Sequence, residues 1–192
     1  MLVRVTHWAN VLAFFGLAIS GVAILLAHPR LYWGETGAVG MPSLIDLPLP
    51  FMLTGQSGWG RYLHFLSAWL CVIAGAPYLI WGAVTRHFAK DFAGREGKYS
   101  ALQGLTYFGV VIVLFPLAVW TGLAMSPAVT SVFPFMVAVF GGQQSARTVH
   151  FAIACLLVCF FLGHVAMVAA NGFVAHMRSM ITGEDFAGGD ES

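Results

Sequence analysis

Charged residues are scarce in this chain. Only 9% of its 192 residues are Asp, Glu, Lys or Arg, whereas a soluble domain usually carries about 25%. Hydrophobic residues make up 59%, a proportion typical of an integral membrane protein. The formal net charge is +1 and no dense basic cluster occurs, so we expect the lipid bilayer as a partner and no nucleic acid.

Cysteine is also rare. The three cysteines, Cys71, Cys155 and Cys159, all lie inside apolar runs. Neither a Cys-x-x-Cys nor a Cys-x-x-Cys-His motif occurs, which argues against covalent c-type haem attachment and against a zinc knuckle. Cys155 and Cys159 share a helix face, so we assign them to the packing of small side chains.

Four long runs of the chain contain no Asp, Glu, Lys or Arg: residues 8–27, 62–84, 105–125 and 149–170. Each run can cross a bilayer as a helix, which satisfies its own backbone hydrogen bonds where lipid offers none. The sequence therefore predicts an all-α integral membrane four-helix bundle, forming one domain over residues 1–192. The first run lacks a clean small-x-small cleavage site, so we interpret it as a span rather than a signal peptide.

The charges that are present predict the orientation. With four spans, Arg4, the loop 83–104 and Arg178 share one side, which carries six Lys and Arg residues against three on the other. The positive-inside rule makes that side cytoplasmic, with both termini inside a bacterial cytoplasmic membrane. On the outer side we expect an irregular cover at 45–53. The apolar stretch 128–140 is too short to cross, so we expect it to be interfacial or re-entrant.

Histidines occur inside or at the ends of three runs: His7, His64, His150 and His164. His150 and His164 are fourteen residues apart, about four helical turns, so they lie on nearly one face about 21 Å apart. By depth we pair His7 with His164 on the inner side and His64 with His150 on the outer side. Two imidazoles at each of two depths suit two bis-histidine haems. The alternative is four histidines hydrogen-bonded to neighbouring helices.

An arginine stands three residues before three of these histidines, as Arg4, Arg61 and Arg147. Residues three apart are neighbours on a helix, so each guanidinium could meet a propionate of a haem bound by that histidine. Alternatively, each arginine marks a helix end and extends to the lipid headgroups. The remaining histidines, His28, His87 and His176, are interpreted as surface residues.

Three segments carry a resemblance to a known family: Arg4-Val-Thr-His7-Trp8, Ala27-His28-Pro29-Arg30-Leu31-Tyr32-Trp33-Gly34 and Gly60-Arg61-Tyr62-Leu63-His64. They resemble the membrane cytochrome b subunit of the thiosulfate reductase type. Its superfamily includes bacterial cytochrome b561, the gamma subunit of formate dehydrogenase and the b-type cytochrome of nickel-iron hydrogenase. The resemblance implies two haems b, with two ligands fourteen residues apart in the last helix, as His150 and His164 are, and one in each of the first two.

A weaker similarity concerns Lys98-Tyr99-Ser100-Ala101-Leu102-Gln103-Gly104, which resembles a family motif before the third helix whose asparagine helps to bind menaquinone. Here Ser100 replaces that asparagine. The resemblance implies a quinone site at the inner haem that includes Ser100, and Asn171 is a further candidate. The alternative for Asn171 is a helix C-terminal residue.

Together these features predict transmembrane electron transfer, as an electron-transfer subunit rather than a catalyst alone. Electrons would pass between the quinone pool and a redox partner. By resemblance, that partner is a molybdopterin oxidoreductase on the outer face near His64 and His150. The alternative is a stand-alone superoxide:quinone oxidoreductase of the cytochrome b561 type, with Arg61 and Arg147 forming a positive approach. A non-redox anchor or transporter, with the histidines as relays, is a further alternative.

Overall fold

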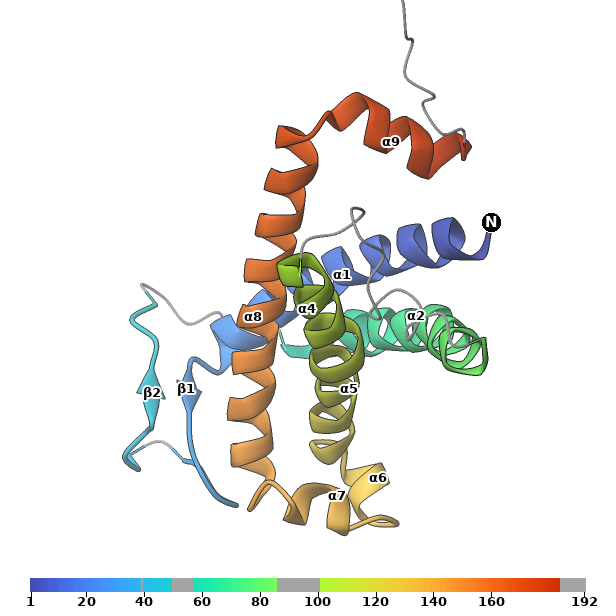
Figure 1. The fold of residues 1–192 in the computed structure, drawn as a ribbon. Helices are drawn as coiled ribbons and strands as arrows, with labels where there is room; N and C mark the ends of the chain where they lie inside the picture. The colour runs from blue at the N-terminus through green and yellow to red at the C-terminus, as the bar shows by residue number, and fades with distance from the viewer. Residues whose placement is uncertain (39, 50–56, 86–100, 184–192) are drawn as a thin grey trace, which may run out of the picture.

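The structure is a computed structural model that describes residues 1–38, 40–49, 57–85 and 101–183. Within these ranges, four helices are long and apolar enough to cross a membrane: Leu2–Ala27, Gly58–Val84, Gly104–Ala124 and Gln143–Ala170. They confirm the all-α membrane architecture that the uncharged runs predict (Figure 1). The stretch 128–140, expected not to cross, contains no helix of spanning length.

The first, second and fourth spans are single helices: α1 (Leu2–Ala27), α2 (Ser57–Val84) and α8 (Gln143–Ala170). The third consists of α4 (Ala101–Phe108), η1 (Gly109–Leu114) and α5 (Phe115–Ala124). All four spans begin a few residues before the corresponding uncharged runs. Backbone hydrogen bonding continues through an arginine or a polar residue, whereas the criterion of an uncharged run stops there.

The third span contains a segment of π-helix, η1, which ends two residues before Pro116. Proline has no backbone N–H, and its ring collides with the carbonyl four residues earlier in a regular α-helix. A wider helical turn at this point accommodates the ring without ending the span. Pro77 lies inside α2, which continues through it.

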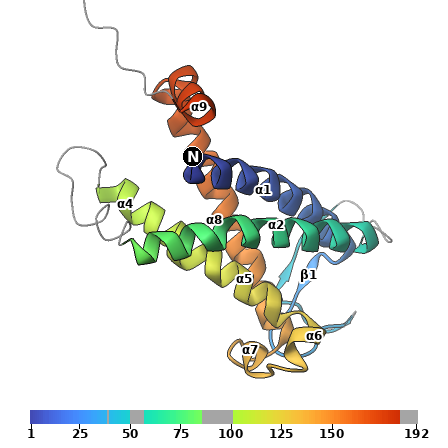
Figure 2. The same ribbon diagram turned by 90° about the vertical axis from the view of Figure 1, so that its right-hand side faces the viewer.

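The spans associate as two antiparallel pairs, α1 with α2 and α5 with α8, and the first pair crosses the second (Figures 1 and 2). Gly16 allows α1 to approach α2 closely, because a Cβ there would overlap Ser67 Oγ and lie 3.1 Å from Ser67 Cβ. Phe161 of α8 stacks on Phe14 of α1 with ring centres 4.7 Å apart. This stacked pair lies where α1 crosses α8.

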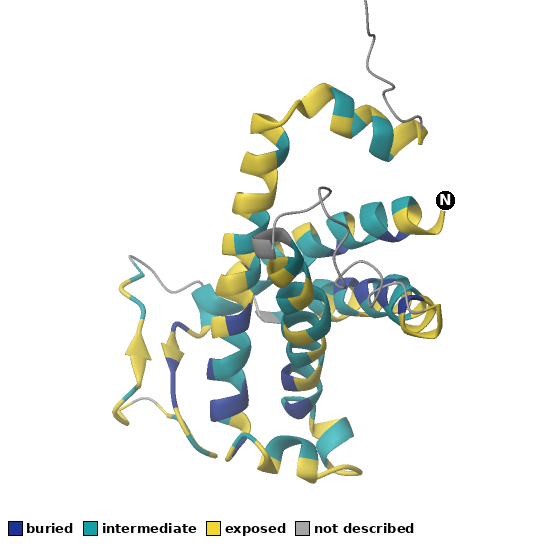
Figure 3. Ribbon diagram, viewed as in Figure 1, coloured by how far each residue is buried: buried dark blue, intermediate teal, exposed yellow. Residues whose placement is uncertain are grey.

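Few of the described residues are buried, and most are intermediate or exposed (Figure 3). Many of the exposed residues are large and apolar. The largest that are fully buried are Leu31, Thr121, Ser20 and Ser145. Exposed apolar side chains along membrane helices are expected to face lipid, and small or hydroxyl residues gather where helices approach each other. Three of these four largest fully buried side chains carry a hydroxyl group.

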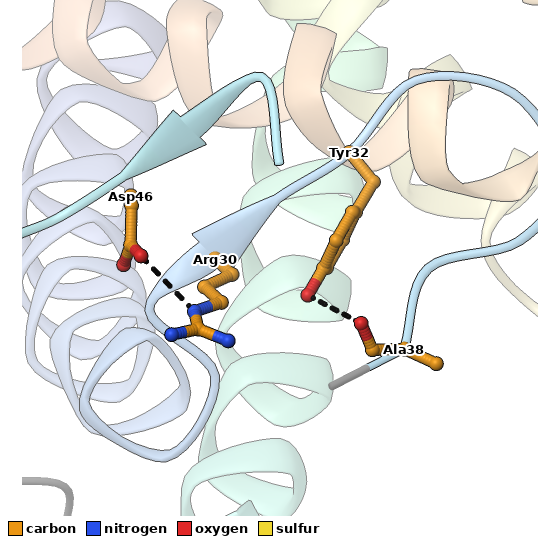
Figure 4. Close-up of polar contacts among 4 residues, drawn as sticks. All are labelled: Arg30, Tyr32, Ala38 and Asp46. Atoms are coloured by element: carbon orange, nitrogen blue, oxygen red, sulfur yellow. Dashed lines mark hydrogen bonds and ion pairs between the residues drawn. The ribbon is translucent and has the colours of Figure 1, made fainter. Parts of the chain in front are cut away.

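Short elements follow α1 and α5 at their ends. Strands β1 (Arg30–Leu31) and β2 (Ile45–Asp46) pair antiparallel, and helices α6 (Pro127–Thr130) and α7 (Phe135–Ala138) precede α8. Arg30 forms an ion pair with Asp46 at 3.1 Å, and Tyr32 donates a hydrogen bond to the Ala38 carbonyl at 3.0 Å (Figure 4). The first two residues of the irregular cover expected at 45–53 form β2 instead, and residues 50–53 lie outside the described ranges.

Helix α9 (Phe173–Thr182) follows α8 through Gly172, which has a φ of 100°, and was not expected from the sequence. It lies over the first turns of α1 (Figure 1). Arg4 donates a hydrogen bond to the Ile181 carbonyl at 3.3 Å, and the Trp8 indole donates one to the Met180 carbonyl at 3.1 Å. These contacts join the two ends of the described chain.

Candidate metal centre formed by two histidine pairs

The first pair of candidate ligands consists of His7 in α1 and His164 in α8. Their ring centres are 6.4 Å apart and their planes are inclined by 58°. Phe160, one turn before His164, stacks on the His164 ring at 5.8 Å. The structure therefore brings together two histidines that are 157 positions apart in the sequence.

The second pair consists of His64 in α2 and His150 in α8. Their ring centres are 6.1 Å apart, with an angle of 64° between the planes. A Cβ at Gly122 of α5 would lie 3.7 Å from His150 Cε1, so the backbone of α5 passes close to this ring. Both expected pairs are thus present as neighbours, one near each end of α8.

These separations fit a metal ion between the two rings of each pair. Imidazole nitrogens bind first-row transition metals at about 2 Å, so two of them on opposite sides of one metal hold their ring centres about 6 Å apart. Within the described ranges, no group of three or more His, Cys, Asp or Glu side chains could hold a metal. A metal that brings its own equatorial ligands, as haem iron does, needs only one such pair.

The other ring nitrogens differ between the pairs. His64 Nδ1 lies 3.0 Å from Ser20 Oγ, and His150 Nδ1 lies 2.8 Å from Thr121 Oγ1. His7 Nδ1 is buried and has no hydrogen-bond partner among the described residues. Ser20 and Thr121 were missed by the sequence analysis. The only available signal was a hydroxyl residue inside an uncharged run.

The three arginines of the Arg-x-x-His pattern lie in different surroundings. Arg4 contacts α9, as described above. Arg147 Nη2 donates a 2.6 Å hydrogen bond to the carbonyl of His28, the C-cap residue of α1. Arg61 is exposed at the start of α2, one turn before His64. A guanidinium has five N–H donors, so these contacts leave donors for an anionic group.

His28 lies at this same end of the molecule, outside the membrane-spanning segments. Partial burial lowers its pKa from 6.5, and the positive charges of Arg147 and Arg61 lower that pKa further. Both effects favour the neutral form of His28. His176 lies in α9, where its Nδ1 is 2.9 Å from the Gly172 carbonyl, and His87 is outside the described residues.

The candidate quinone residues are less well defined. Ser100 lies outside the described residues. Asn171 is exposed at the C-terminus of α8, where its Nδ2 donates a 2.8 Å hydrogen bond to the Met167 carbonyl. This contact is that of a helix-terminal residue, and it leaves the amide oxygen of Asn171 available as an acceptor.

Comparison with known proteins gives three findings. A family model described as prokaryotic cytochrome b561 matches residues 1–183. YedZ1 of Azospira oryzae, assigned as a protein-methionine-sulfoxide reductase subunit, is 31% identical over 192 residues, covering 86% of this chain and 87% of that protein. YdhU of Escherichia coli, assigned as a cytochrome, is 28% identical over 199 residues, covering 94% of this chain and 71% of that protein. No solved structure matches the chain at a significant level.

Proposed function

The chain belongs to the prokaryotic cytochrome b561 family, and from this premise we propose that it conducts electrons across the membrane through two b-type haems, one held by each histidine pair. A member of this family binds b-type haem, transfers electrons and spans the bacterial inner membrane several times. Beyond these family properties, we propose the number of haems, their ligands, the quinone and the partner.

The observation that carries the proposal is the separation of the rings, 6.4 Å in one pair and 6.1 Å in the other. Both values agree with the distance of about 6 Å that two axial imidazoles on one metal require. The ligands His150 and His164 lie fourteen residues apart on α8, so the two haems would sit about 21 Å apart along that helix. This spacing suits electron transfer from one membrane leaflet to the other.

The chain's own residues would determine what the haem can do. A bound haem supplies reversible one-electron chemistry at its iron. His7 with His164, and His64 with His150, would hold one haem each through their imidazole nitrogens. The apolar side chains of the spans exclude water and keep the local dielectric constant low. Arg4, Arg61 and Arg147 remain the proposed partners of the haem propionates.

We place the electron exchange with quinone near the His7–His164 pair, with Ser100 and Asn171 as the candidate binding residues. On the opposite side, near the His64–His150 pair, we propose an oxidoreductase partner. The name of YedZ1 supports a reductase in this role. A molybdopterin enzyme is the narrower expectation that comes from the resemblance in the sequence, and neither of the two relatives is named after one.

Oxidation of superoxide by the protein alone is the competing function. It requires an open, positively charged approach to the His64–His150 pair. Arg61 is exposed and fits such an approach, whereas Arg147 is directed to the His28 carbonyl. Superoxide consumption by the purified protein, measured without any partner, distinguishes the two functions.

The direct test is a count of haem per protein in histidine variants. We expect His64→Ala and His150→Ala each to remove one haem and leave the other, and His7→Ala and His164→Ala to remove the other one. Pyridine haemochrome assays should then give half of the wild-type haem in each single variant. A double variant of one pair should keep half, and a double variant across the pairs should keep none.

His176→Ala is the matched control, because His176 lies in α9 and uses its ring in a contact with the Gly172 carbonyl. It should retain both haems. If all four ligand variants keep the wild-type haem content, or if each of them loses both haems equally, the proposed pairs are wrong.

A further inference from the structure

Two hydroxyl groups are fully enclosed at the His64–His150 pair. Ser20 in α1 and Thr121 in α5 both have 0% exposure. Ser20 Oγ lies 3.0 Å from Nδ1 of His64, and Thr121 Oγ1 lies 2.8 Å from Nδ1 of His150. Each hydroxyl comes from the helix that is packed against the histidine's own helix, so the two contacts form the same arrangement twice.

The backbone determines which way these hydrogen bonds run. Ser20 Oγ is 2.6 Å from the Gly16 carbonyl, and Thr121 Oγ1 is 2.8 Å from the Leu117 carbonyl. A carbonyl can only accept, so the single proton of each hydroxyl is used in the bond to its own helix. The hydroxyl oxygen can then accept a hydrogen bond from the Nδ1–H of the imidazole. This arrangement favours the tautomer in which each imidazole donates from Nδ1–H, and that tautomer leaves the Nε2 lone pair available to a metal.

The other pair lacks this arrangement. Thr6 is the neighbour of His7 in the sequence, and its hydroxyl is 3.0 Å from the carbonyls of Leu2 and Val3. It therefore resembles Ser20 in its contact with its own helix. However, His7 Nδ1 has no partner in the part of the chain that the structure describes. The hydroxyl contact is thus a property that distinguishes the two pairs.

We propose that Ser20 and Thr121 are positioning residues for the His64–His150 haem. They hold each imidazole in one tautomer and one ring orientation and make it a stronger electron donor to iron. An acceptor at the second nitrogen of a metal-bound histidine raises the basicity of the ligand, and its loss typically costs 10- to 100-fold in metal affinity. A more basic axial ligand stabilises ferric over ferrous iron, so the hydroxyls lower the midpoint potential of this haem. The inference rests on the proposed function.

The experiment uses Ser20→Ala and Thr121→Val in the full-length protein, purified with its haem. Thr6→Val is the matched control, because it also removes a hydroxyl that bonds to its own helix in a span. The readouts are the midpoint potential of each haem by redox titration, the electron paramagnetic resonance spectrum of each ferric haem, and haem retention during dilution. Spectra of His7→Ala, which keeps only the His64–His150 haem under the proposed function, assign the signals.

We expect the midpoint potential of the His64–His150 haem to rise in both variants, its ferric signal to shift, and its affinity to fall by about tenfold. The other haem should keep its wild-type values, and Thr6→Val should change neither. The conservative variants Ser20→Thr and Thr121→Ser retain the hydroxyl and should restore the wild-type potential. Restoration of the potential by these variants would show that the potential depends on the hydroxyl group and not on packing alone.

Two outcomes overturn the inference while the proposed function stands. In both, His64→Ala still removes one haem. In the first, neither hydroxyl variant alters the potential or the ferric signal of that haem; in the second, both haems shift equally, which indicates a change of packing. If instead His64→Ala and His150→Ala leave the haem content unchanged, the proposed function fails, and the inference fails with it.

Discussion

The start of α8 depends on one glycine, and replacing it should destabilise the protein strongly. Gly142 precedes α8 with φ 133° and ψ 169°, a backbone region that only glycine populates readily. A Cβ there would overlap the carbonyl of Gly34 and lie 2.6 Å from the amide nitrogen of Glu35. Gly142→Ala must therefore both strain its own backbone and displace the segment that contains Gly34.

That segment caps the helix. The Gly34 carbonyl accepts hydrogen bonds from the amides of Gln144 at 3.0 Å and Ser145 at 3.3 Å, and the Gly34 amide donates to Ser145 Oγ at 2.7 Å. Backbone strain of this kind costs about 1–3 kcal/mol. Each lost hydrogen bond adds about 1 kcal/mol. We therefore expect Gly142→Ala to lower the free energy of unfolding by about 4–6 kcal/mol in total.

Gly141→Ala is the matched control. Gly141 also has a positive φ, 74°, but a Cβ there would meet no atom within 4 Å. Gly141→Ala should therefore lower the free energy of unfolding only by the strain of a left-handed backbone, about 1–2 kcal/mol. The difference of about 3 kcal/mol corresponds to a melting temperature lower by roughly 10 °C for Gly142→Ala, measured by circular dichroism in detergent. Equal melting temperatures for the two variants would refute the cap formed by Gly34.

Two further predictions concern charge. Burial and the charges of Arg147 and Arg61 lower the pKa of His28 from 6.5, so the unfolded chain binds this proton more readily than the folded one. The folded protein should therefore lose stability as pH falls below about 6.5, and His28→Gln should flatten that part of a pH–melting curve; identical curves would contradict this. Arg30 and Asp46 are 43% and 54% exposed in their ion pair. A double-mutant cycle of Arg30→Ala and Asp46→Ala should give a coupling below about 1 kcal/mol, and a larger value would disprove the assignment to an exposed pair.

The four spans could be predicted because the membrane imposes a simple rule. Lipid excludes charge and unpaired backbone groups, so uncharged runs of about twenty residues become helices. The proximity within each histidine pair could also be anticipated. His64, His150 and His164 lie inside these runs and His7 directly precedes the first, and the regular rise of a helix assigns a depth to each. Their role as ligands stays a prediction that the variants above test.

Contacts between distant segments could not be predicted. A serine or threonine in an apolar helix normally bonds to its own carbonyls, and nothing local indicates that Ser20 or Thr121 also reaches a histidine of another helix. The pairing of β1 with β2 likewise joins two-residue segments that are too short to carry a periodic pattern. The sequence also associated Arg4 and Arg147 with haem propionates, without revealing their bonds to the Ile181 and His28 carbonyls.

The position of α8 along its own axis affects both histidine pairs. α8 carries one histidine of each pair, so a shift of one residue would move both by about 1.5 Å and rotate both by about 100°. Two hydrogen bonds that oppose such a shift lie in its first turns. Arg147 bonds to the His28 carbonyl, and Thr148 donates a buried 2.6 Å hydrogen bond to the Tyr32 carbonyl. Damage to these contacts should therefore affect both pairs together, whereas loss of the Ser20 or Thr121 hydroxyl should affect one.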